Sequence, residues 1–192
     1  MANNLLVLLI NKISSNNVVL YSLLGICPLI LYRINLQECL STGIIIVVIM
    51  LVSSWLNLFI YHFLLLPLNF THMAIVLFVF ITYLTIHYTK IAMNQYYPSF
   101  AILFKQYPEF FYTNYAIYGT TMLNISNNVV FWNYTLSVLG SGLGYFIVIF
   151  IFMAIKERIY TIKRISTPSR LFMELSILAL MSLVFSSITG LR

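Results

Sequence analysis

The residues best able to do chemistry lie in one apolar stretch, NNVVLYSLLGICPLI, which covers residues 16–30. It begins with Asn16 and Asn17 and carries Cys27 between an isoleucine and a proline, two residues after Gly25. A thiolate is a soft ligand for transition metals, but a lone buried cysteine more often packs as a small hydrophobic residue. Cys39 is the only other cysteine, and no CxxC spacing occurs, so the sequence indicates neither a disulfide framework nor a zinc site.

Two charged residues also interrupt apolar stretches: Lys12, within NKISSNN, and Glu109, within KQYPE. Ionisable side chains inside a membrane are costly, and they indicate a functional site by default. One interpretation is therefore a Lys12–Glu109 ion pair, or a polar path through both residues. The other is that each side chain snorkels to its nearer surface, because a span starting at residue 5 places Lys12 only about 11 Å deep.

The elements that position these residues are expected to be membrane helices. The chain has 192 residues, of which 61% are hydrophobic and 7% charged, and its mean hydropathy is +0.97. Such a composition excludes an ordinary soluble domain. Continuous apolar runs favour helices over barrel strands and predict an all-α membrane fold with six transmembrane helices, near residues 5–30 (broken), 41–63, 73–89, 99–123 (broken), 135–155 and 171–189.

The positive charges predict how these helices are oriented. If the odd-numbered loops share one face, that face holds eight of the ten Lys and Arg residues, and the other face and the termini hold only Lys12 and Arg192. The positive-inside rule then places the odd loops in the cytoplasm and both termini outside. This bias, with some attraction to anionic membrane lipid, accounts for the net charge of +6, so no nucleic-acid partner is indicated.

The two broken spans occupy matching places in the two halves of the chain. An offset of 97 residues superposes the six spans as three plus three, and it pairs Asn17 with Asn114. Three crossings are an odd number, so the halves must have opposite orientations. A single polytopic domain of two inverted three-helix repeats is therefore expected, with repeat 1 at about 1–95 and repeat 2 at about 96–192, and the breaks indicate a functional site between them.

Four segments resemble the A-subunit family of the Rnf (or Rsx) ion-translocating electron-transport complex. They are NNVVLYSLLGICP (16–28), TNYAIYGTTMLN (113–124), GSGLGYFIVIFIFMAIKERI (140–159) and LMSLVFSSITGL (180–191). The resemblance extends nearly from end to end. It implies a multi-pass bacterial inner-membrane subunit with both termini periplasmic, in a complex that couples electron transfer between ferredoxin and NAD to ion movement.

The resemblance also implies a cofactor and a partner. In the family, one cysteine in each broken span, with two more from the homologous E subunit, holds a 2Fe-2S cluster. Cys27 matches the first cysteine, whereas Tyr115 replaces the second. Because a phenol oxygen is a harder donor than a thiolate, we expect the cluster to be lost or altered rather than retained. Backbone groups of Asn16, Asn17, Thr113 and Asn114 are expected to line the central break.

Three functions remain open from the sequence. The first is a redox subunit of the ion-translocating oxidoreductase complex, with no catalytic site on this chain alone. The second is a stand-alone secondary transporter or channel, because inverted repeats with broken helices also suit that role. The third is a scaffold that completes the membrane part of the complex without redox activity.

Overall fold

The computed structural model describes Gly25, Ile30 and residues 36–68, 71–125, 131–162 and 167–190. The elements within these ranges are α4 (Leu36–Ile60), a π-helical turn η1 (Tyr61–Leu65), a short 3₁₀ turn η2 (Thr71–Met73), α5 (Ala74–Tyr96), α6 (Pro98–Gln106), α7 (Pro108–Tyr112), α8 (Tyr115–Ile125), α9 (Phe131–Ile162) and α10 (Thr167–Gly190). The described residues contain no strand, which confirms the all-α membrane class.

Three helices among the described residues are long and apolar enough to cross a membrane, namely Leu36–Leu65, Ala74–Tyr96 and Phe131–Tyr160. They correspond to the expected second, third and fifth spans. The expected sixth span corresponds to α10, whose uninterrupted apolar part covers Leu171–Phe185. The expected first span lies outside the described residues except for Gly25 and Ile30.

The expected fourth span is broken, as predicted. Two Tyr-Pro pairs account for its segmentation: Tyr97 and Tyr107 both have non-helical backbone angles, and the proline after each begins the next helix. A residue before proline is disfavoured in the helical region, whereas proline itself suits the first helical position. A second interruption, at Thr113 and Asn114, separates α7 from α8 and was not predicted as a separate break.

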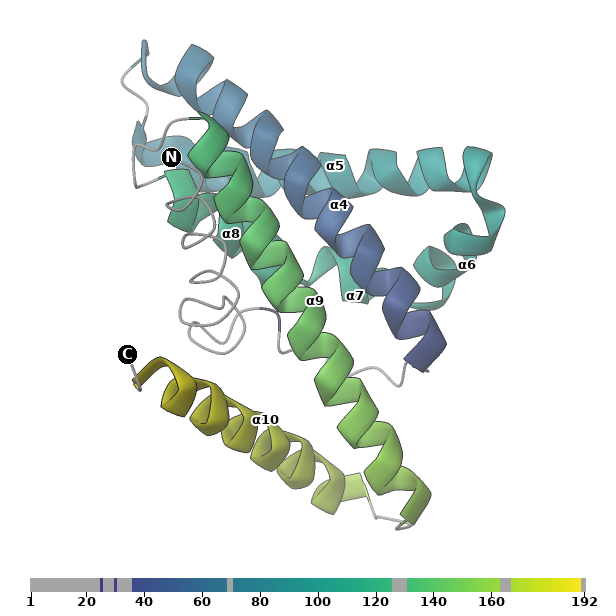
Figure 1. The fold of residues 1–192 in the computed structure, drawn as a ribbon. Coiled ribbons are helices and arrows are strands. Elements are labelled where there is room, and N and C mark those ends of the chain that lie inside the picture. Colours follow the sequence, from purple (N-terminus) through teal and green to yellow (C-terminus); the bar gives the residue numbers. More distant parts are fainter. Residues whose placement is uncertain are drawn as a thin grey trace.

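The core of the bundle is the packing of α4 against α9, which lie side by side in Figure 1. Contacts between them join Gly43 to Phe146, Val47 to Gly142, and Ser54 to Tyr134. Residue numbers rise along one helix as they fall along the other, so the two helices are antiparallel. This is the relation that inverted repeats require of their middle helices; the repeat boundaries stay a prediction.

Helices α5 and α8 complete the bundle around this pair, and the N-terminal part of α10 meets the C-terminal part of α9 (Figure 1). Buried aromatic residues fill the space beneath the broken segment. The rings of Phe104 and Phe111 stack with centroids 4.0 Å apart. Both are almost fully buried. The break is therefore held against the bundle by packing.

Candidate site at the break between α7 and α8

Asn114 organises the break. Its side-chain Oδ1 accepts a hydrogen bond from the backbone N–H of Ala116 at 3.1 Å, which caps the first turn of α8. Its Nδ2 donates to the hydroxyl of Tyr145 on α9 at 2.5 Å. Both residues are fully buried, so these bonds satisfy polar groups that lipid could not. The structure places Asn114 in the interruption between α7 and α8, where its side chain serves as a helix cap. Its predicted role in lining the central break stays a prediction.

Gly25, from the expected first broken span, lies against this cap. Its φ of +81° falls in the left-handed region that favours glycine. A Cβ atom at this position would lie 2.7 Å from Asn114 Oδ1, 2.8 Å from Tyr145 Cε2 and 2.9 Å from Ala116 Cβ. Only a residue without a side chain fits there. Gly25 and Asn114, which are 89 residues apart in the sequence, therefore meet at one point.

Tyr115 follows the cap as the first residue of α8, and 59% of it is exposed. It belongs to a cluster of tyrosines that the sequence analysis missed. The rings of Tyr115 and Tyr118 lie 6.2 Å apart, and those of Tyr83 and Tyr112 lie 5.2 Å apart. The hydroxyl of Tyr118 donates to the backbone oxygen of Tyr112 across the break at 3.3 Å. Phenol groups thus surround the position that the resemblance assigns to a cysteine.

Comparison with known proteins identifies the family. The family model described as "Rnf-Nqr subunit, membrane protein" matches residues 5–192. The chain belongs to the Rnf-Nqr subunit family. Proteins named as the A subunit of an ion-translocating oxidoreductase complex are similar to this chain. The protein from Sodalis glossinidius is 29% identical over 190 residues, which cover 98% of each chain. The protein from Aeromonas hydrophila is 26% identical over 187 residues, which cover 97% of this chain and 96% of the relative. The predicted resemblance to this family is confirmed.

Among the residues that the structure describes, the donor atoms near Tyr115 do not form a thiolate set. Cys39, in the first turn of α4, is only 1% exposed and lies within electrostatic range of the buried Tyr145. It therefore faces the interior of the bundle. Within the described ranges no group of three or more His, Cys, Asp or Glu side chains could hold a metal ion. Cys27 lies outside those ranges, so its predicted role as a ligand stays a prediction.

The other predicted site residues are placed as follows. Thr113 is exposed in the break, and its hydroxyl donates to the backbone oxygen of Glu109 at 2.6 Å. Glu109 is exposed in the first turn of α7. Lys12, Asn16 and Asn17 lie outside the described residues. The proposed Lys12–Glu109 pair and the asparagine lining of the first break are therefore untested.

A buried ion pair joins two residues that were not paired from the sequence. Lys156 Nζ on α9 lies 3.1 Å from Glu174 Oε1 on α10, and the Tyr160 hydroxyl donates to the same carboxylate oxygen at 2.5 Å. The sequence analysis counted Lys156 among the cytoplasmic charges, but the side chain is buried and neutralised. The available signal was Glu174 itself, the only acidic residue within the expected sixth span.

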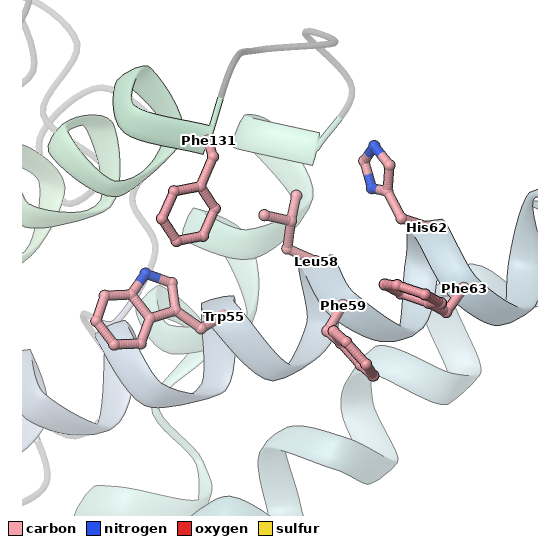
Figure 2. Close-up of a pocket in the computed structure, with 6 residues that line it drawn as sticks. All are labelled: Trp55, Leu58, Phe59, His62, Phe63 and Phe131. Atoms are coloured by element: carbon pink, nitrogen blue, oxygen red, sulfur yellow. The ribbon is translucent and has the colours of Figure 1, made fainter.

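A separate groove of about 460 Å³ lies at the other end of the bundle (Figure 2). Its lining residues are Trp55, Leu58, Phe59, His62, Phe63 and Phe131. Figure 2 shows the Phe131 ring above Trp55, with His62 near the end of the same helix. Trp55 also donates to the Thr135 hydroxyl at 3.2 Å, which fixes the indole. Aromatic and imidazole side chains of this kind suit a membrane–water interface, and none of the lining residues belongs to the break.

Proposed function

We propose that this chain is a membrane subunit of a redox-driven, ion-translocating oxidoreductase complex, as the names of its relatives say of those proteins. The observation that carries the proposal is the contact between Gly25, from the expected first broken span, and Asn114, in the interruption between α7 and α8. Interrupted backbone at membrane depth must face protein, water, an ion or a cofactor. A meeting point of two such segments is therefore a place for transfer through the membrane.

The finer assignment follows the sequence analysis. The chain resides in a bacterial inner membrane as two inverted three-helix repeats, with both termini periplasmic. Its principal partner is the homologous E subunit, which covers the tyrosine cluster at the break, namely Tyr83, Tyr112, Tyr115 and Tyr118. Phenol hydroxyls in that cluster support this partner, because hydrocarbon offers them no hydrogen-bond acceptor.

Tyr115 favours a second candidate function, in which this chain does not supply two thiolate ligands to a cluster. A phenol on an exposed ring supplies a harder and weaker donor than the thiolate that a 2Fe-2S cluster requires. We infer that the cluster at this position is lost or altered. If the cluster is altered, Cys27 supplies the surviving thiolate of this chain. If the cluster is lost, the chain is a scaffold that completes the membrane part of the complex.

Iron analysis of the assembled complex separates these cases. The complex is purified with the native chain, with Tyr115→Cys and with Cys27→Ala, and iron is quantified beside the electron paramagnetic resonance spectrum. Tyr115→Phe serves as the matched control, because it keeps the ring and removes the only donor atom. Iron that is present natively and lost with Cys27→Ala supports the redox subunit. Iron that is absent natively and gained with Tyr115→Cys rules out the redox role and leaves the scaffold.

The stand-alone transporter is tested by purification alone. A tagged chain extracted in mild detergent is expected to retain companion membrane subunits, and genes for those subunits are expected beside its own. If the chain purifies alone and catalyses ion exchange in liposomes without electron donors, the proposed membership of a complex is wrong.

A further inference from the structure

Two buried side-chain polar atoms lack a hydrogen-bond partner among the described residues: Asn57 Oδ1 and Ser141 Oγ. Asn57 Oδ1 is the one that lies beside other buried polar side chains. Asn57 on α4 is fully buried, and its Oδ1 accepts no hydrogen bond from the part of the chain that the structure describes. A buried polar atom without a partner costs roughly 1–3 kcal/mol. Such atoms are rare in native interiors, and each one calls for an explanation. A ligand of Oδ1 would supply it.

Three hydroxyl groups lie around the same level of the bundle. Asn57 Nδ2 donates to Thr82 Oγ1 on α5 at 3.3 Å, and Ser54 Oγ lies 3.1 Å from Thr121 Oγ1 on α8. Ser54 and Asn57 are three residues apart on α4, so both face the same neighbours. All four residues are fully buried. Asn57 and three hydroxyl-bearing side chains, from three helices in all, therefore lie in one buried polar region that contains the unpartnered Oδ1.

The cluster lies well inside the membrane. Asn57 is eight residues from the end of the continuous Leu36–Leu65 helix, and Thr82 is eight residues from the start of α5. Both are thus about 12 Å from the same end of the bundle at 1.5 Å per residue. Asn57 is 0% exposed, so Oδ1 has no contact with solvent, and a ligand reaches it only along a path through the protein.

The chemistry of the cluster identifies the class of ligand. Hydroxyl and amide oxygens are hard neutral donors, which suit hard cations, and sodium sites in transporters likewise use neutral oxygens at membrane depth. A hydroxyl that donates one hydrogen bond keeps lone pairs for a cation. Helix packing alone explains the Ser54–Thr121 and Asn57–Thr82 bonds. It leaves the open carbonyl oxygen of Asn57 unexplained.

We propose that Ser54, Asn57, Thr82 and Thr121 form a binding site for a small monovalent cation, with Asn57 Oδ1 as its central ligand. The proposal rests on the proposed function, because it locates a cation site in one subunit of an ion-translocating complex. The site lies between α4, α5 and α8, and Asn114 at the break does not belong to it. Cation binding at this site is a step in ion passage that is separate from the transfer point at Gly25 and Asn114.

The test uses cation-dependent stability of the purified complex, which requires no electron flow. Thermal unfolding is followed in detergent while NaCl replaces choline chloride at constant ionic strength. Binding to the folded state raises the folded-to-unfolded ratio by 1 + [Na⁺]/Kd, about 11-fold at ten times Kd. We expect a saturable rise of the unfolding midpoint with Na⁺ and none with choline.

Adjacent residues provide matched controls. Ser53 is as buried as Ser54, but its hydroxyl donates to its own helix, to the Met50 oxygen. Ser54→Ala is expected to reduce the sodium-dependent rise at least several-fold, and Ser53→Ala is expected to leave it unchanged. The same contrast applies to Thr82→Val and to Thr85→Val, because the Thr85 hydroxyl donates to the Ile81 oxygen of its own helix.

Substitutions at the central ligand complete the test. Asn57→Leu is expected to abolish the sodium-dependent rise. Asn57→Asp adds a carboxylate and is expected to move the midpoint of the sodium titration to lower concentration, so it stays informative if Asn57→Leu does not fold. A sodium-dependent rise that survives all site variants, or no such rise in a complex that retains its subunits, overturns the cation site. Loss of the companion subunits during purification of the native chain instead overturns the proposed function.

Discussion

Lys156 on α9 and Glu174 on α10 form an ion pair of 3.1 Å whose side chains are 4% and 2% exposed. The ammonium also lies 5.6 Å from the centre of the Phe152 ring. Charges removed from water in this way must be paired, since the desolvation of either one alone is not repaid. The pair therefore joins α10 to α9 at the end of the bundle where the connection between the two helices begins.

Removing one partner of this pair is expected to destabilise the chain strongly. Lys156→Met leaves a buried carboxylate without its cation, which costs about 3–5 kcal/mol. The measurement is the free energy of unfolding in mixed detergent micelles. The double variant Lys156→Met/Glu174→Met replaces both charges with apolar groups and should recover most of the loss. If the single and double variants are equally unstable, the loss reflects packing rather than the unpaired charge.

The cap at Asn114 supports a second prediction. Asn114→Ala removes the acceptor for the Ala116 N–H, worth about 0.5–2 kcal/mol, and leaves the buried Tyr145 hydroxyl without its partner, which costs a further 1–3 kcal/mol or so. Hydrogen–deuterium exchange should show faster exchange in the first turn of α8. Tyr145→Phe is the matched control, because it removes the bond to α9 and keeps the cap. Unchanged exchange in α8 with Asn114→Ala would contradict the capping role.

How much of this site the sequence predicts depends on the kind of interaction. The break at Tyr107 has a local cause, the Tyr-Pro pair, so it was predictable from residues 105–109 alone. The partners of Asn114 are not local: Tyr145 is 31 residues away, and Gly25 is 89 residues away in the other half of the chain. Their meeting depends on how α4, α8 and α9 pack, which hydropathy does not specify. The Lys156–Glu174 pair was missed for the same reason, since each residue alone resembles an interfacial charge.

Gly25 supports a third prediction because two physical costs coincide there. Gly25→Ala forces a residue with a Cβ into a left-handed conformation, at roughly 1–2 kcal/mol, and places that Cβ 2.7 Å from Asn114 Oδ1. We expect lower yield of folded protein and a reduced free energy of unfolding in mixed micelles. In a double-mutant cycle, Asn114→Gly should relieve the part of the steric loss that comes from Asn114, and it should leave the contacts with Tyr145 and Ala116 and the backbone cost. Strict additivity of the two substitutions would show that the residues are not in contact.

The membrane orientation supports a last prediction, which uses two exposed aromatic residues at opposite ends of the bundle. Tyr97, between α5 and α6, is 62% exposed, and Trp132, in the first turn of α9, is 71% exposed. The positive-inside assignment places Tyr97 on the cytoplasmic side and Trp132 on the periplasmic side. An impermeant maleimide should therefore label Trp132→Cys in intact spheroplasts and Tyr97→Cys only in inverted vesicles. The parent chain, labelled in parallel, corrects for its own two cysteines, and the opposite pattern would reverse the orientation of every helix.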